Sequence, residues 1–220
     1  MGSKKKEKEE THPRRTRRSK VGDLIQIDGS YHAWFEERGE KCCLLVFIDD
    51  ATSQIMYARF CQAETTLGYM EGIRLYIEKY GKPKAYYSDK HSTFRVNREE
   101  VKKGVRQTQV GRALKELKIE LICTHSPQAK GRVERANGTL QDRLVKEMRL
   151  RGISTMKEGN RYLEEYMKTH NQKYAVKPAE EEDGHVACHE NLKEILALKE
   201  QRKVTKDLSI QYQKHQELFV

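Results

Sequence analysis

Three acidic side chains have the type and the placement for joint chemistry. Asp28 falls near the end of an alternating apolar segment, Asp89 follows a short Tyr-rich segment, and Glu134 begins a long amphipathic segment. Several carboxylates that converge repel one another unless a divalent cation compensates their charge, and oxygen ligands of this kind suit Mg²⁺ or Mn²⁺. Two such ions about 3.5–4 Å apart can activate a water or a 3′-hydroxyl in phosphoryl transfer. The three acids therefore predict a metal-dependent phosphoryl-transfer site.

Each acid also has an ordinary structural explanation. Asp28-Gly29 is a common turn dipeptide, Asp89 could simply end a strand, and Glu134 carries a charge that the dipole at a helix N-terminus favours. The pattern of the three acids alone leaves these explanations open. The elements around the acids decide whether the side chains can meet.

The hydrophobic pattern predicts those elements. Residues 24–28 alternate like a strand that Gly29 and Ser30 end, and residues 43–48 are continuously apolar, as in a strand buried on both faces. If the first strand neighbours the strand before Asp89, their ends bring two acids together, and a helix crossing that edge supplies the third. The other elements that we expect are an antiparallel strand at 55–61, a helix capped by Thr65 or Thr66 and stopped by Gly81, strands at 84–88 and 119–123, a loop at 90–107, and helices at 110–117, after 131 and around 162–166. This order is typical of an α/β layer fold.

Four segments around the acids closely resemble the catalytic core of DDE transposases and retroviral integrases: residues 22–29, 45–52, 87–92 and 126–141. Bacterial insertion-sequence transposases of the ISNCY type are the most similar members, and the resemblance covers residues 14–215. It implies an RNase H-like fold, a mixed five-stranded sheet flanked by helices, with a basic N-terminal arm and a truncated C-terminal β segment. It also implies that Asp28, Asp89 and Glu134 hold two Mg²⁺ (or Mn²⁺) ions for DNA strand cleavage and joining. Retroviral integrases have fewer residues between the second Asp and the Glu than the 44 found here, so the role of the loop at 90–107 is left open.

Cations and amides near the acids are candidates for DNA contact. On a helix, residues 130, 134, 137, 138 and 141 share one face, a polar stripe whose alternative explanation is an ordinary solvated surface. Cations suit phosphates, and amides suit sugar or base edges. The residues that we expect to contact DNA are Arg14, Arg15, Arg17, Arg18, Lys90, His91, Gln128, Lys130, Arg132, Arg135, Asn137 and Gln141.

The positive charge is concentrated at the N-terminus. The 220 residues include 43 Lys and Arg against 33 Asp and Glu, a formal net charge of +10, and the first twenty residues contribute nine of those cations and three Glu. We expect residues 1–21 to be disordered when alone. Such an arm is either a solubilising tail or a phosphate-binding segment that gains affinity by releasing counterions, and we favour the second.

Composition excludes several classes of protein. The apolar fraction of 36% is enough for a core, which argues against wholesale disorder, and no apolar run is long enough to span a membrane. The N-terminus lacks the apolar stretch of a signal peptide, so we expect a cytoplasmic, nucleoid-associated protein. The five cysteines form no C-x-x-C pair, and we interpret His185-Val-Ala-Cys188-His189 as a polar loop rather than a zinc site. We likewise interpret Asp49-Asp50 as a turn and Trp34 as a packing anchor.

Two functions of different kinds fit these residues. The first is a transposase that acts on element ends and target DNA as a homo-oligomer, and the second is a non-catalytic DNA-binding product of a decayed element that inhibits transposition. The presence of all three acids favours the first. An RNase H-type or Holliday-junction nuclease would want a fourth clustered carboxylate, which none of the motifs supplies. The expected domains are the arm (1–21), the catalytic core (22–175), a linker with a helix (176–199), and the start of an incomplete β-domain (200–220).

Overall fold

The computed structural model describes residues 15–89, 93, 94, 96, 107–123, 127–200, 204, 206, 209–212 and 215–218. Its centre is a mixed five-stranded sheet in the order β3-β2-β1-β4-β5. The first three strands form an antiparallel meander, β4 pairs in parallel with β1, and β5 pairs in parallel with β4. The strands are β1 (Ile25–His32), β2 (Cys42–Asp49), β3 (Ile55–Cys61), β4 (Ala85–Ser88) and β5 (Glu120–Cys123).

Strand β2 shows why the sheet needs a helical layer on each side. All eight of its residues are buried, because its apolar run faces two different cores on alternate positions. Leu44, Val46 and Ile48 join one core cluster, while Cys43, Leu45 and Phe47 join the other. The continuously apolar run thus confirms the prediction of a strand that is covered on both faces.

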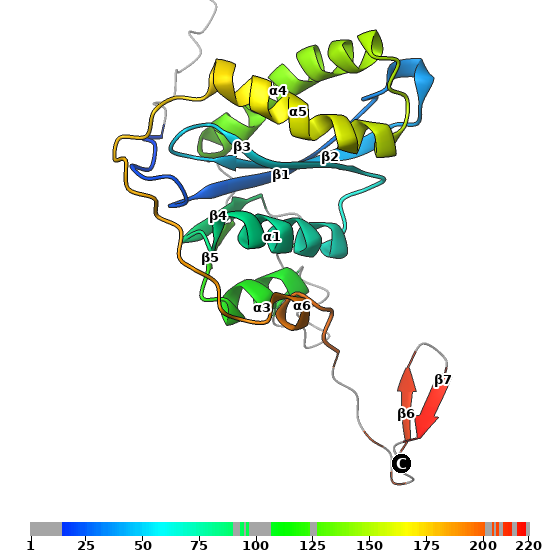
Figure 1. Cartoon of the computed structure of the whole chain (residues 1–220). Helices are drawn as coiled ribbons and strands as arrows, with labels where there is room; N and C mark the ends of the chain where they lie inside the picture. The colour runs from blue at the N-terminus through cyan, green and yellow to red at the C-terminus, as the bar shows by residue number, and fades with distance from the viewer. Residues whose placement is uncertain are drawn as a thin grey trace, which may run out of the picture.

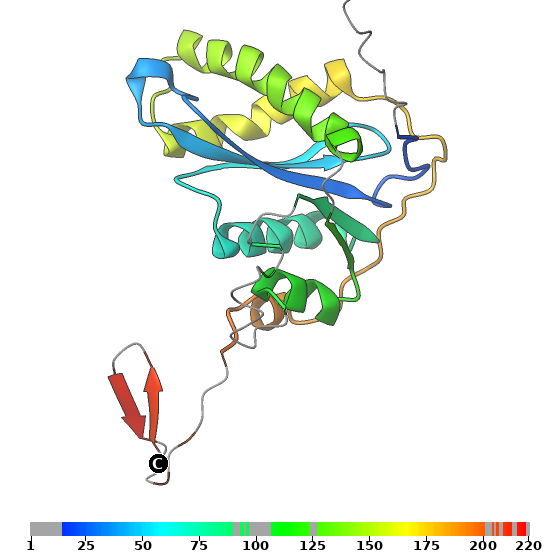
Figure 2. The ribbon, with the colours of Figure 1, turned by 180° about the vertical axis from the view of Figure 1, so that it is seen from behind.

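Helices cover both faces of the sheet, as Figure 1 shows edge-on and Figure 2 from behind. On one face lie α4, which packs on β1 and β2, and α5, which packs on β3; on the other lie α1 and α3. The helices are α1 (Thr66–Tyr80), α3 (Gln109–Glu116), α4 (Pro127–Leu150), α5 (Met156–Tyr174) and the short α6 (Leu192–Ile195), with a 3-10 turn η1 (Glu36–Arg38). No described helix is long and apolar enough to cross a membrane.

Local signals in the sequence explain most of the helix boundaries. The Thr65 side chain caps α1 by accepting from the Gly68 N–H, as predicted, and Gly81 follows the last residue of α1 with a φ of 93° that favours glycine. The Thr155 and Glu158 side chains form a reciprocal capping box at the start of α5. The expectation that Gly29 and Ser30 end the first strand is wrong, because β1 continues through both residues to His32.

The segment before β1 is hydrogen-bonded to the segment that follows α5. Residues 175–199 leave α5 and run down one side of the sheet to α3 and α6 (Figure 1). On the way, the Glu180 and Gly184 N–H groups donate to the Ser19 and Val21 carbonyls. The described part of the N-terminal segment, from Arg15, is therefore docked on the core, and residues 1–14 of the expected arm lie outside the described residues. Further along, the predicted C-terminal β segment is a hairpin of β6 (Ser209–Tyr212) and β7 (His215–Leu218).

Candidate active site

Strand register aligns two of the three acids. Parallel strands β1 and β4 pair Ile25 with Tyr86 and Gln26 with Tyr87. Continuing that register by two residues sets Asp28 of β1 level with Asp89, which directly follows β4. Both acids are half-buried, so they stand at the rim of the sheet rather than inside it. The prediction that the first strand neighbours the strand before Asp89 is confirmed, although Asp28 lies within β1 rather than at its end.

Helix α4 is joined to β1 by a regular series of hydrogen bonds, which we call the β1–α4 ladder. Gln26, Asp28 and Ser30, at alternate positions of β1, point to the α4 face. Each is bonded to a residue of α4, and successive partners lie four positions apart along the helix. The distances between donor and acceptor are 3.2, 2.9 and 3.0 Å for Val133 N to Gln26 Oε1, Asn137 Nδ2 to Asp28 Oδ2, and Gln141 Nε2 to Ser30 Oγ. The ladder therefore fixes both the position and the rotation of α4 against the strand that carries Asp28.

Glu134 is placed by the same helix but is not drawn into the sheet. It lies one turn before Asn137, next to the rung made by Val133, and it is exposed. Among the described residues, no group of three His, Cys, Asp or Glu side chains is arranged to hold a metal ion. Asp28 and Asp89 are thus brought together by the sheet, while Glu134 extends from the adjacent helix into solvent.

A fourth acid lies close to Asp28, on the opposite face of β1. A Cβ added to Gly29 would stand 2.2–2.4 Å from the Glu64 side-chain atoms, so the glycine leaves room for that carboxyl group. The Tyr69 hydroxyl donates to Glu64 across 2.8 Å. Burial raises the pKa of Tyr69, and the charges of Glu64 and Asp28 raise it further. Sequence analysis missed Glu64, because nothing in its own segment relates it to Gly29.

Several predicted DNA contacts have internal partners in this structure. Arg132 and Asn137 are 8% and 7% exposed, the first paired with Asp50 and the second with Asp28, which differs from the solvent-facing role predicted for them. Arg15 is also paired with Asp50, and Arg17 donates to the Asp50 and Ala51 carbonyls.

Of the remaining predicted contacts, Gln141 is half-buried and donates to Ser30, and the others are exposed or lie outside the described residues. Arg18 and Arg135 are exposed, so contact of these two with phosphate stays a prediction. Arg14, Lys90, His91 and the side chains of Gln128 and Lys130 lie outside the described part of the chain.

Two other sequence interpretations concern local structure. Asp49 and Asp50 do form a turn, in which the Asp49 carboxylate accepts from Thr52 at 2.7 and 2.8 Å, while both carboxylates are fully buried. In the loop interpreted as a polar segment, His185 contacts the Tyr76 hydroxyl across 2.6 Å and Cys188 donates to Glu190. Trp34 is fully buried and donates to the Ser30 carbonyl, as expected of a packing anchor.

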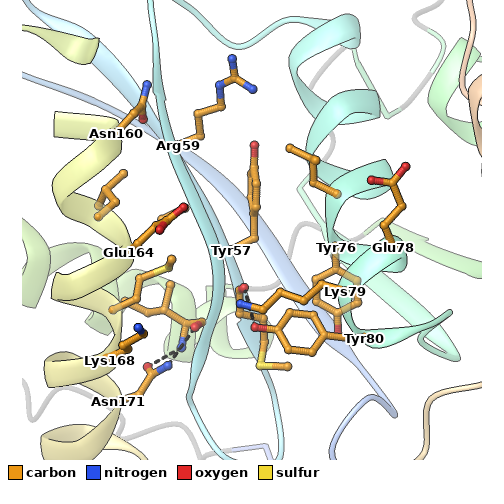
Figure 3. Close-up of a pocket in the computed structure, with 16 residues that line it drawn as sticks. Tyr57, Arg59, Tyr76, Glu78, Lys79, Tyr80, Asn160, Glu164, Lys168 and Asn171 are labelled. Atoms are coloured by element: carbon orange, nitrogen blue, oxygen red, sulfur yellow. Dashed lines mark hydrogen bonds between the residues drawn. The ribbon is translucent and has the colours of Figure 1, made fainter. Parts of the chain in front are cut away.

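A groove of about 820 Å³ lies away from the acids, at the β3 edge of the sheet between α1 and α5 (Figure 3). Two asparagines of α5 line it and pair with the backbone of β3. Asn171 accepts from the Ile55 N–H and donates to its carbonyl, and Asn160 does the same at Phe60. Side chains of α5 thus pair with both ends of the edge strand β3. None of the three acids lines the groove.

The chain is similar in sequence to transposases. It is 47% identical over 213 residues to a Sinorhizobium fredii protein named "Putative transposase y4bF", covering 96% of this chain and 47% of that protein. It is 39% identical over 168 residues to the transposase for insertion sequence IS1202 of Streptococcus pneumoniae, covering 76% of this chain and 36% of that protein. The chain therefore spans less than half the length of these curated relatives. No family model matches it.

Two solved retroviral structures share this fold. The catalytic core domain of HTLV-2 integrase, in complex with magnesium, superimposes with a TM-score of 0.52 at 18% identity, covering 73% of this chain and 94% of that one. The simian T-cell lymphotropic virus intasome, in complex with a PP2A regulatory subunit, gives a TM-score of 0.57 at 17% identity, covering 90% of this chain and 65% of that one. The fold is that of an integrase catalytic core, which is RNase H-like.

Proposed function

From the premise that this chain has a DDE transposase/integrase-like core, similar in sequence to insertion-sequence transposases, we propose that it cleaves and joins DNA strands in transposition. The observation that carries the proposal is the alignment of Asp28 of β1 with Asp89 at the end of the neighbouring strand β4, beside the helix that carries Glu134. The sequence similarity supports the choice of a transposase among the functions that this fold can host.

The donor set fits a divalent cation. Asp28, Asp89 and Glu134 offer only carboxylate oxygens, and Asn137 adds a buried amide oxygen, Oδ1, that has no hydrogen-bond partner among the described residues. Mg²⁺ and Mn²⁺ prefer such oxygen ligands, and when bound they would activate the attacking oxygen and stabilise the leaving one. We propose that the three acids hold the metal, as the magnesium-bound HTLV-2 core suggests by analogy of fold.

Each described residue of the site then has a task. Asp28 and Asp89 supply fixed negative charge from the rigid sheet, and the Asn137 amide holds the Asp28 carboxylate in one orientation. Glu134, exposed on α4, completes the set from the side on which a substrate arrives. The exposed guanidinium groups of Arg18 and Arg135 suit DNA phosphates, and we propose that the chain works as a homo-oligomer on DNA.

The test is metal-dependent cleavage of a candidate element end by purified protein. With Mg²⁺ or Mn²⁺ the unaltered chain should cleave the DNA, whereas Asp89→Asn and Glu134→Gln should not, because both substitutions keep the size and remove the charge that would compensate the ions. Asp142→Asn is the matched control, since Asp142 lies on the same helix as Glu134 and pairs with Lys146 on its exposed side.

The control variant should retain cleavage, and all three variants should keep the melting temperature of the unaltered chain. Undiminished cleavage by Asp89→Asn or Glu134→Gln would refute the assignment of the site. Loss of cleavage in Asp142→Asn as well would mean that charge on α4 in general, rather than the three acids, supports the reaction.

A further inference from the structure

A buried carboxylate outside the proposed site joins three separate segments of the chain. Asp50, in the turn between β2 and β3, is fully buried. Its Oδ1 accepts from Gln26 of β1 at 2.7 Å, from Arg132 of α4 at 2.8 Å and from the Arg15 guanidinium, and its Oδ2 accepts from the Arg18 backbone N–H at 2.8 Å. We call Asp50 and these donors the Asp50 cluster.

The Asp50 cluster reaches the helix that carries Glu134. Arg132, two residues before Glu134, donates to Asp50 with one terminal nitrogen and to the Arg15 carbonyl with the other, at 3.0 Å. Gln26 donates to Asp50 and accepts from the Val133 N–H, so it belongs both to the cluster and to the first rung of the β1–α4 ladder. The docked N-terminal segment and α4 are therefore held by the same carboxylate.

At this end of α4 the described apolar packing is thin. Val133 is the first fully buried apolar residue of the described side chains of α4, and the next, Leu140, comes two turns later. Gly131 has open space where a side chain would begin. The turn that presents Glu134 is consequently held by the apolar contacts of Val133 and the partly buried Ala136, and by the polar contacts of Arg132, Val133 and Asn137.

We infer that Asp50 and Arg15 are positioning residues of the proposed active site: by docking residues 15–18 on the first turns of α4, they fix the direction in which Glu134 is presented. This inference rests on the proposed function. A buried ion pair of this kind contributes little net stability, because desolvation offsets most of the attraction, so we expect its effect on the placement of α4 rather than on the free energy of unfolding. Arg15 thereby has a role other than phosphate contact.

Arg15→Ala is the decisive variant, because it removes one donor and leaves Asp50 paired with Arg132, so no buried charge is left uncompensated. We expect cleavage of bound DNA under single-turnover conditions to slow by about tenfold or more, since a small misplacement of a reacting group has effects of this size. DNA affinity should stay within about twofold, with an unchanged dependence on salt. Arg15→Lys, which keeps the charge, should recover part of the rate.

A second readout does not depend on activity. Hydrogen–deuterium exchange of the amides at residues 131–137 should be faster in Arg15→Ala than in the unaltered chain, while exchange in β2 stays the same. Arg74→Ala is the control, because the Arg74 side chain is 27% exposed against 29% for Arg15 and pairs with Glu78 on α1, far from the acids. It should change neither cleavage nor exchange at 131–137.

Three results would overturn the inference or separate it from the proposed function. A weaker DNA affinity with a salt slope reduced by about one would make Arg15 a phosphate contact instead. Unchanged cleavage and unchanged exchange would show that the cluster does not act on α4. If the unaltered chain itself cleaves no DNA, the proposed function fails, and exchange at residues 131–137 alone then decides whether Arg15 holds the helix.

Discussion

Asn137 donates its amide N–H to a carboxylate oxygen of Asp28 across 2.9 Å, and it does so from a position that is only 7% exposed. This hydrogen bond fixes the orientation of the Asp28 carboxylate. In metal sites, substitution of a residue that orients a ligand typically lowers metal affinity or activity by about 10- to 100-fold.

Asn137→Ala should therefore lower the metal-dependent cleavage rate by about 10- to 100-fold and raise the Mg²⁺ concentration needed for half-maximal rate. The measurement is a Mg²⁺ titration of cleavage at saturating DNA. Thr139→Ala, on the same helix and with a hydroxyl that donates to the Arg135 carbonyl, should leave the titration unchanged. Equal titration curves for Asn137→Ala and the unaltered chain would show that Asp28 needs no such support.

Gly29→Ala should destabilise the fold, because the new Cβ would overlap the Glu64 carboxyl group and push it away from the Tyr69 hydroxyl. We expect a loss of about 1–3 kcal/mol in the free energy of unfolding, measured by urea denaturation. Gly138→Ala is the opposite case, since nothing lies within 4 Å of its added Cβ and the residue is inside α4. It should gain about 0.5–1 kcal/mol. A destabilised Gly138→Ala variant would reveal a backbone requirement that the helix does not show.

His170 should make stability depend on pH below neutrality. Burial lowers the pKa of His170 to about 4, and the ring lies between Tyr166 and Tyr174. Because its ordinary pKa is about 6.5, the unfolded chain takes up the proton first as the pH falls. This contribution is fully present above pH 6.5 and is lost between pH 6.5 and 4, by about 3 kcal/mol at most.

The check compares urea denaturation of the unaltered chain and His170→Phe at several pH values in that window. Carboxylates titrate there too, so the informative quantity is the difference between the two proteins, which should shrink as the pH falls. A difference that is constant from pH 7 to pH 4 would mean that His170 is protonated as readily in the folded chain as in the unfolded one.

Asn171→Ala should expose the β3 edge. It removes the acceptor for the Ile55 N–H and the donor for its carbonyl, at 2.8 and 2.9 Å. The expected loss is about 2 kcal/mol in the free energy of unfolding, one for each neutral hydrogen bond. Light scattering should also report more self-association, because an uncovered edge strand can pair with another chain. Asn171→Asp keeps the acceptor and loses the donor, so its loss should be about half as large.

The sequence predicted the sheet and its flanking helices well where one signal dominated. The apolar run of β2, the Thr65 cap and the Gly81 that follows α1 each have a single structural explanation, and each was confirmed. The prediction that the first strand ends at Gly29 and Ser30 was wrong, because it rested on the low strand propensity of these two residues alone. In the structure, pairing with Leu45 and Leu44 of β2 overrides that propensity.

The sequence indicated the three acids of the proposed site but not the residues that hold them in place. Gln26, Asp28 and Ser30 are polar at every second position of an otherwise apolar strand, and positions 133, 137 and 141 recur every fourth residue of a helix. Together, these two periods indicate that one face of the strand contacts one face of the helix, as in the β1–α4 ladder. The contacts of Asp50 and Glu64 were not readable, because they join segments far apart in sequence whose proximity exists only after the sheet has formed.

The β1–α4 ladder also limits which changes of chain length the core can accept. Four helical residues advance about 6.0 Å, while two strand residues advance about 6.6 Å, so helix and strand fall out of step by roughly half an ångström per rung. Asp28 occupies the middle rung, where this accumulated mismatch is smallest. Inserting a single residue into α4 between Val133 and Asn137 would turn the rest of the helix by about 100° and move every later rung to the wrong side. The spacing from Val133 to Gln141 is thus a fixed length.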